Sequence, residues 1–413
     1  MKLPAHESTT AQLGAVYPFA ASRTLPIGGV VIGRDRFGGV FAHDPFELYA
    51  AGVLTNPNMV VLGQIGRGKS TFVKSYLFRQ AAFGRRIVVL DPKGEYGPLA
   101  AALGVTPIAL RPDGDYRINP LDVSVTGRAG ETPSRRRLEL AAAIGVAAMR
   151  RELRPVEHAA LERALTRIEA VRTAPPTFAD LFAGMLEPTD EDARSIGMTR
   201  LALADGSRDL ALELRRLVLG ELRGMFDGPT SAGLDLDGNV VILDLAALYH
   251  SPALGVLTTC AAAAIERSVR QSQAQRTVLV VDEAWAVLTN IGVARFLQSS
   301  WKFARAWGVA NIAVVHRVSD LAAVGPSGSE TGRLAEGLLA DSETVVCYGQ
   351  PASELPLAAP LLGLSPEETR LVGHLGRGSA LWKVAGRSFL VDHCITDDEK
   401  RLVYTDQNMA GRG

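Results

Sequence analysis

The stretch VVLGQIGRGKSTFVKSY, residues 60–76, decides how the surrounding chain folds. It contains the spacing G-x-x-x-x-G-K-S, which begins at Gly63 and ends at Ser70. An apolar run precedes this motif and a helix-compatible run follows it, which predicts a strand, a glycine-rich turn and a helix. The backbone N–H groups of such a turn converge on phosphate oxygens, and the dipole of the following helix adds to the attraction. The stretch therefore predicts a phosphate-binding loop.

Two side chains of this loop carry specific chemistry. Lys69 is expected to reach the β- and γ-phosphates of a nucleotide, and Ser70 is expected to place its hydroxyl on Mg²⁺. An arginine would not easily replace Lys69, because the pocket suits a compact ammonium group. ATP and Mg²⁺ are therefore the expected cofactors. The predicted nucleotide-binding residues are Gly63, Gln64, Ile65, Gly66, Arg67, Gly68, Lys69, Ser70 and Thr71.

An acidic residue after a buried strand is the expected partner of this loop. Asp244 follows the run VVIL, and Asp282 follows TVLVV and is itself followed by Glu283. Hydrolysis needs one carboxylate near Mg²⁺ and a second one that polarises the attacking water. Only the second pair supplies both, so Asp282 is predicted on the metal side and Glu283 as the general base. Asp244 is interpreted as a strand-end residue of the same sheet.

Strand-like and helix-like segments alternate along much of the chain. This pattern predicts an α/β core with a mostly parallel sheet. Two runs, 379–384 and 387–392, suggest an antiparallel hairpin at the edge of that sheet, and a Gly/Ser-rich loop is predicted at 324–332. The other predicted β segments are a hairpin at 27–44 and strands at 58–62, 85–91, 106–112, 239–245, 277–283, 311–316 and 343–348.

A long helical segment rich in Ala, Leu, Arg and Glu interrupts the β–α alternation. It is predicted as an all-helical insertion into the core, with Pro155 at a first helical position and capping boxes at Thr177 and Thr189. The expected organisation is an N-terminal arm at 1–25, the first part of the core at 26–130, the insertion at 131–225, the second part of the core at 226–395 and a C-terminal tail at 396–413.

Composition limits the classes of function. Lys plus Arg and Asp plus Glu both number 44, so no global positive field favours nucleic acid or an anionic membrane. The three cysteines, Cys260, Cys347 and Cys394, have no metal-type spacing and are read as reduced thiols of a cytoplasmic protein. No signal-peptide pattern and no apolar run of about 18 residues occurs, so we expect no membrane span.

Further motifs follow the loop in a fixed order. An extra glycine, Gly66, gives the loop the form G-x-x-G-x-G-K-S. DPKGEY ends the second strand, INPLD and GMFDGPTS flank the helical insertion, and DEAW begins at Asp282. In this order and spacing the chain resembles the type IV secretion and conjugative-transfer ATPases of the VirB/TraC type, a branch of the FtsK–HerA superfamily. The resemblance covers about residues 26–395.

The resemblance implies a RecA-like P-loop ATPase core with Walker A and Walker B motifs, a helical insertion and a homo-hexameric ring. It also implies ATP hydrolysis coupled to moving DNA or protein through a cell-envelope machine, with other secretion or conjugation components as partners. Many relatives carry a separate N-terminal docking domain, which is expected here to be absent or supplied by another chain. A peripheral position at the cytoplasmic face of the inner membrane would then come from docking.

The resemblance also assigns residues outside the loop. Where AVVHR places His316, the family usually has a polar sensor, often Gln, so His316 is expected to sense the γ-phosphate. The segment FARAWG matches a family arginine that acts in trans on the neighbour's γ-phosphate, and this role is carried over to Arg305. Arg377 and Arg317 remain rival candidates for that role.

Asp91 and Glu95, in the DPKGEY motif, admit two interpretations. They lie at the end of the second strand, where such a sheet binds ligands. The resemblance implies a place for this acidic pair near the nucleotide or a subunit interface, which is one interpretation. They are explained almost as well as polar residues of a turn.

Three functions are compatible with these features. The first is an ATP-hydrolysing motor of a conjugative transfer or type IV secretion-like system. The second is a DNA translocase of the FtsK–HerA type, which the zero net charge disfavours because DNA motors generally need basic surfaces. The third is a nucleotide-dependent assembly factor with little hydrolysis. The presence of Lys69, Ser70, Asp282 and Glu283 argues against the third function.

Overall fold

A single sheet runs through the computed structural model, which describes residues 25, 28–36, 38–122, 132–249, 251, 253–271, 275–288, 291–322 and 330–403. In this part of the chain the sheet has eleven strands in the order β2-β1-β11-β10-β9-β3-β8-β7-β4-β6-β5. The strands are β1 Val30–Asp35, β2 Val40–His43, β3 Met59–Leu62, β4 Arg86–Asp91, β5 Ile108–Ala109, β6 Val240–Asp244, β7 Thr277–Val281, β8 Val309–Val315, β9 Thr344–Tyr348, β10 Ser379–Val384 and β11 Arg387–His393.

The strands from β9 to β5 in this order are all parallel, which confirms the predicted mostly parallel sheet. Every residue of β3, β4, β7, β8 and β9 is buried. Parallel strands covered on both faces read as continuous apolar runs, as these do. Alternate side chains of β3 enter two different cores, with Val60 and Leu62 in one and Met59 and Val61 in the other.

The antiparallel part of the sheet corrects one prediction. β10 and β11 form the predicted hairpin, but they do not lie at the sheet edge. β11 pairs with β1, with Gly33 opposite His393, and β2 forms the edge instead. A Cβ atom at Gly33 would overlap the carbonyl oxygen of Asp392, so this glycine permits the close approach of the two strands. The N-terminal hairpin thereby satisfies the backbone groups that β11 would otherwise expose.

Helices cover both faces of the sheet. α3 Lys69–Ala82, α4 Gly97–Ala102 and α17 Asp397–Val403 contribute to the core that contains Met59. α10 Leu254–Gln271, α12 Ile291–Trp307 and α14 Glu330–Ala340 contribute to the other core. The shorter helices are α2 Pro45–Ala50, α11 Ala284–Leu288, α13 Val318–Ala322, α15 Leu355–Leu361, α16 Pro366–His374 and the 3₁₀ turn η2 Ala246–Leu248. None of the described helices is long and apolar enough to cross a membrane.

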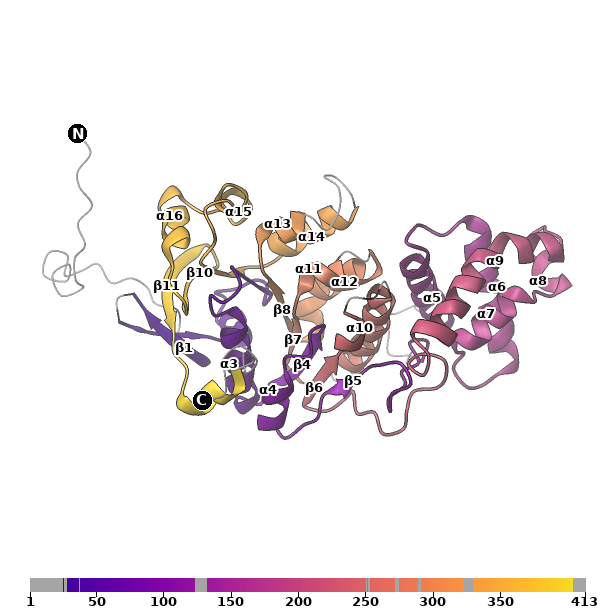
Figure 1. Ribbon diagram of the computed structural model, residues 1–413, viewed down its shortest axis with the longest axis horizontal. Helices are drawn as coiled ribbons and strands as arrows, with labels where there is room; N and C mark the ends of the chain where they lie inside the picture. The colour runs from indigo at the N-terminus through magenta and orange to yellow at the C-terminus, as the bar shows by residue number, and fades with distance from the viewer. Residues whose placement is uncertain are drawn as a thin grey trace, which may run out of the picture.

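The helical segment lies at one end of the molecule, and β1, β10 and β11 lie toward the other end (Figure 1). Its helix α5 packs against α10 and α12 of the core. Pro155 opens α6, and the capping boxes at Thr177 and Thr189 are both present, as predicted. The segment consists of α5 Pro133–Met149, α6 Pro155–Val171, α7 Phe178–Leu186, α8 Asp190–Arg194, α9 Arg200–Arg216 and the π-helix η1 Leu217–Glu221.

Some of the predicted segments lie wholly or partly outside the described residues. Of the predicted arm at 1–25, only Leu25 belongs to the described residues, and it is buried. Residues 324–329 of the predicted Gly/Ser-rich loop at 324–332 also lie outside them, and residues 330–332 form the start of α14 instead of a loop. The predicted tail begins with α17, whose Leu402 is buried against the core. The domain boundaries drawn from the sequence remain our proposal.

Candidate nucleotide-binding site

The loop between β3 and α3 has the strand–turn–helix form that the sequence predicts. Three of its glycines have positive φ angles, of 152° at Gly63, 80° at Gly66 and 111° at Gly68. A Cβ atom at Gly63 would overlap the Cβ of Tyr348 on β9, so this position admits only glycine without movement of the backbone. The loop then enters α3 at Lys69.

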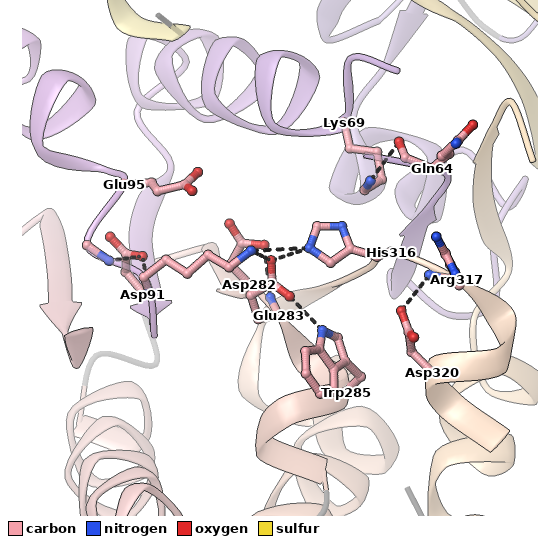
Figure 2. Close-up of polar contacts among 12 residues, drawn as sticks. Gln64, Lys69, Asp91, Glu95, Asp282, Glu283, Trp285, His316, Arg317 and Asp320 are labelled. Carbon is pink, nitrogen blue, oxygen red and sulfur yellow. Dashed lines mark hydrogen bonds and ion pairs between the residues drawn. The ribbon is translucent and has the colours of Figure 1, made fainter. Parts of the chain in front are cut away.

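Lys69 lies inside the arc of this loop and is 4% exposed. Its Nζ donates hydrogen bonds to the carbonyl oxygens of Gly63 and, at 3.2 Å, Gln64 (Figure 2). Burial lowers the pKa of the Lys69 ammonium to about 8, against the opposing effect of the Glu283 and Asp282 carboxylates. Ser70 follows in the first turn of α3 and is partly buried.

The other predicted site residues lie at the same edge of the sheet, the one formed by the carboxyl ends of its parallel strands. β8 lies between β3 and β7, so His316 after β8 lies between the loop and Asp282 after β7. The Gly63 N–H donates to the carbonyl oxygen of His316 at 3.3 Å. Carboxyl ends of parallel strands form the ligand-binding edge of an α/β sheet. Lys69, His316, Asp282 and Glu283 therefore gather at that edge, as Figure 2 shows.

Asp282 is buried and firmly oriented. Its Oδ2 accepts a hydrogen bond from the Tyr96 hydroxyl at 3.0 Å, and its Oδ1 accepts one from the Glu283 N–H at 2.9 Å. Burial, and then the Glu283 charge, raise the pKa of this carboxyl.

The residues present fit a magnesium ion. Ser70 and Asp282 offer only oxygen donors, which Mg²⁺ prefers, and Mg²⁺ typically takes one or two protein ligands together with water and phosphate oxygens. The described residues contain no group of three or more His, Cys, Asp or Glu that could hold a metal ion.

Glu283 has an unusual backbone and a crowded carboxylate. Its φ angle is 49°, in the left-handed region, and its side chain is almost fully buried. Oε1 contacts the Lys93 ammonium and, at 2.5 Å, Nε2 of His316, while Oε2 accepts from Trp285 Nε1 at 2.6 Å (Figure 2). Burial raises the pKa of this carboxyl, but the bonds from His316 and Lys93 outweigh burial and lower the pKa to about 2. Both oxygens of the predicted general base are therefore occupied.

Lys93 is the residue that the sequence analysis missed. It belongs to the motif DPKGEY, in which only Asp91 and Glu95 were considered as site residues. A signal was available, because this chain of 413 residues has few lysines and three of them, at 69, 74 and 93, lie within one short segment that begins at the loop.

Asp91 builds the turn that carries Lys93, and Glu95 belongs to the same turn. Asp91 Oδ1 accepts from the N–H groups of Lys93 at 3.2 Å and Gly94 at 2.9 Å, and its Oδ2 accepts from Tyr96 N–H at 3.0 Å. Burial raises the pKa of Asp91 to about 6. Glu95 lies 3.9 Å from the Lys74 ammonium. The turn interpretation therefore explains the hydrogen bonds of Asp91.

Asp244 occupies the place that the sequence predicts for it. It ends β6, opposite Asp91 in the parallel register, and its Oδ1 accepts from the Ala246 N–H at 2.9 Å. It is thus a strand-end residue of the same sheet.

The three arginine candidates lie in different places. Arg305 is exposed in the last turn of α12, just before β8 begins. It therefore lies at the amino ends of the parallel strands, at the edge of the sheet opposite the phosphate loop. Arg317 directly follows His316, and its N–H donates to Asp320 Oδ2 at 2.9 Å. Arg377 lies in a loop that borders the phosphate loop of its own chain, because the adjacent Gly378 N–H donates to the Arg67 carbonyl at 2.9 Å. The structure brings Arg317 and the Arg377 loop to the site, and Arg305 to the far edge.

Comparison with known proteins agrees with this geometry. Residues 52–252 match the family model for the central domain of helicase HerA. This match covers just under half of the chain. It begins before β3 and ends after β6, so the matched residues include the phosphate loop and DPKGEY but not Asp282.

Solved structures extend the likeness beyond residues 52–252. VirB4 of Thermoanaerobacter pseudethanolicus has a TM-score of 0.77 and 24% identity, over 92% of this chain and 100% of that chain. Plasmid coupling protein TrwB, in complex with ADP and Mg²⁺, has a TM-score of 0.61 and 16% identity, over 94% and 93%. These values show a shared fold, the RecA-like P-loop ATPase fold expected from the resemblance. No curated protein sequence is a significant match.

Proposed function

We propose that this protein is an ATP-hydrolysing motor of a conjugative transfer or type IV secretion-like system that acts as a homo-hexameric ring. The observation that supports it best is the sheet edge where a glycine-rich loop with Lys69 and Ser70 meets Asp282 and Glu283. Such an edge presents hydrogen-bond donors for the phosphates on one side and two carboxylates with different environments on the other, as nucleotide hydrolysis requires.

Each residue then has a role. The backbone N–H groups of residues 63–71 would hold the phosphates of ATP, and Lys69 would contact the β- and γ-phosphates. Ser70 and Asp282 would hold Mg²⁺, which supplies charge neutralisation of the phosphates. Glu283 would orient the attacking water, and His316 would sense the γ-phosphate. Arg305 is proposed as the residue that acts on a neighbouring subunit, with Arg317 and Arg377 as alternatives.

The partners and the cellular location are proposed from the similarity to solved structures. VirB4 and the conjugative coupling protein TrwB share this fold, and by analogy the partners would be other secretion or conjugation components. The ring would lie in the cytoplasm, at the cytoplasmic face of the inner membrane where docking holds it.

Two other functions have an observation in their favour. The match to a helicase HerA domain favours a translocase that pumps DNA directly. The occupied carboxylate of Glu283 favours an assembly factor with little hydrolysis.

The test is steady-state ATP hydrolysis by the purified protein, with and without single- and double-stranded DNA. Glu283→Gln serves as the background control. Hydrolysis that DNA does not change is expected for a secretion motor that awaits protein partners. Strong stimulation by DNA would favour the direct translocase. No hydrolysis above the control in any condition would overturn the motor proposal and favour the assembly factor.

A further inference from the structure

The contacts of Glu283 differ from those expected of a ready general base. A base must present an oxygen to the attacking water. Here one oxygen contacts both Lys93 and His316, and the other accepts from the indole N–H of Trp285. Three donors from three elements thus hold one almost fully buried carboxylate.

Lys93 is held in place for this contact. Its turn is fixed by the three hydrogen bonds that Asp91 accepts. The same turn carries Tyr96, whose hydroxyl binds Asp282. Lys93 Nζ also lies 3.3 Å from His316 Nε2, so both donors converge on the same oxygen of Glu283. The turn at residues 91–96 therefore contacts both acids of the site.

We propose that Lys93 is a positioning residue that, together with His316, latches Glu283 in a resting arrangement and so limits basal hydrolysis. This proposal rests on the proposed function. It adds to that function a contact that regulates the rate of ATP hydrolysis. The latch has three features in its favour: both carboxylate oxygens are taken, the donors are charge-assisted or buried, and Glu283 has a left-handed backbone that its surroundings must maintain.

The geometry also indicates how the latch opens. His316 follows the strand between the loop and Glu283, and its carbonyl accepts from Gly63 at the start of the loop. A γ-phosphate in the loop would offer oxygens of higher charge to the same donors. Lys93 and His316 would then exchange Glu283 for phosphate, which leaves a carboxylate oxygen for water. Only hydrogen bonds and ion pairs change partners in this exchange, and no covalent bond is made or broken.

The first experiment compares the steady-state hydrolysis of Lys93→Met with that of the wild type. Loss of one charge-assisted contact should raise basal kcat about tenfold, with KM for ATP changed by less than about twofold. Lys93→Arg keeps a cationic donor and should remain close to the wild type. Lys302→Met makes the same chemical change at an exposed position on α12 and serves as the matched control. A fall of kcat toward the Glu283→Gln background, or equal effects of Met and Arg at position 93, would overturn the latch.

The second experiment does not depend on turnover. The protein is labelled with 5-fluorotryptophan, and the ¹⁹F resonance of Trp285 is identified through Trp285→Phe. The indole N–H of Trp285 binds the latched carboxylate, so Lys93→Met without nucleotide should shift this resonance, and Lys302→Met should not. A non-hydrolysable ATP analogue with Mg²⁺ should move the wild-type resonance in the same direction. An unmoved Trp285 resonance in Lys93→Met would overturn the latch.

The two readouts separate the proposals. Wild-type protein and Lys93→Met that both fail to hydrolyse ATP would overturn the proposed motor, while the ¹⁹F shift would still decide whether Lys93 positions Glu283. Hydrolysis by the wild type with no gain in Lys93→Met would retain the motor and reject the latch.

Discussion

Tyr96 donates its hydroxyl hydrogen to Asp282 Oδ2 at 3.0 Å, and both side chains are buried. Tyr96 comes from the turn after β4 and Asp282 from the end of β7, the neighbouring strand. This bond fixes the orientation of the carboxylate proposed to hold Mg²⁺. The turn at 91–96 therefore contacts Asp282, the proposed Mg²⁺ ligand, as well as Glu283.

Tyr96→Phe tests this support. Loss of an outer hydrogen bond to a metal-binding carboxylate should weaken the apparent Mg²⁺ affinity in ATP hydrolysis by about tenfold or more. The measurement is the Mg²⁺ dependence of the steady-state rate. Tyr76→Phe removes another buried hydroxyl, one that lies 3.2 Å from His43 Nδ1, and should leave the Mg²⁺ dependence unchanged. Equal Mg²⁺ curves for Tyr96→Phe and the wild type would contradict the prediction.

Gly63→Ala should abolish tight nucleotide binding. The added Cβ overlaps Tyr348, and the φ of 152° suits no other residue, so the first turn of the loop must move. Binding of a fluorescent ATP analogue measures the effect. Gly84→Ala is the matched control, because Gly84 also has a positive φ, of 73°, but faces open space. It should cost about 1 kcal/mol of stability and leave nucleotide binding intact. Retained binding in Gly63→Ala would refute the steric argument.

His43 should make the protein less stable in acid. Burial lowers its pKa to about 4, against the opposing charge of Asp44, and its ring nitrogens lie near the hydroxyls of Tyr76 and Thr344. Between about pH 6.5 and pH 4 the unfolded chain binds a proton that the folded chain does not, so stability falls as pH falls. The full stability associated with neutral His43 is present above about pH 6.5.

Urea unfolding of the wild type and His43→Gln at two pH values checks this prediction. From about pH 7.5 to pH 5 the wild type should lose about 2 kcal/mol more than the variant, because the amide does not titrate. Other groups titrate in both proteins and cancel in the comparison. An identical pH dependence for the two proteins would show that His43 is not the cause.

The place of Arg305 makes a mixing experiment decisive. It lies at the edge of the sheet opposite Lys69 of its own chain, so it would act only on another subunit. Arg305→Ala and Lys69→Ala should each lose roughly 10³-fold in hydrolysis. Mixtures of the two variants should regain activity, since some interfaces of the proposed ring then pair an intact Lys69 with an intact Arg305.

Arg377→Ala mixed with Lys69→Ala is the comparison. The Arg377 loop borders the phosphate loop of the same chain, so mixing should restore nothing if this arginine acts in cis. Recovery with Arg377→Ala and none with Arg305→Ala, at every mixing ratio, would reverse the assignment.

Much of the site could be predicted from the sequence because its signals are local. The phosphate loop needs glycines at fixed spacing between a strand and a helix, and all of these lie within residues 60–76. The capping boxes at Thr177 and Thr189 join residues three positions apart. The buried parallel strands are readable because both of their faces must be apolar.

What the sequence could not predict depends on contacts between distant residues. Lys93 and Glu283 are 190 positions apart, and no local pattern indicates that the turn after β4 reaches the acid after β7. The pairing of β1 with β11 depends on Gly33 lying opposite a strand more than 350 positions away, so the predicted edge hairpin was misplaced. The motif spacing determines which groups can bind phosphate, since all of these groups lie in one short segment of the chain. The order of strands alone decides which charges meet Glu283, because side chains from neighbouring strands contact each other only after the sheet has formed.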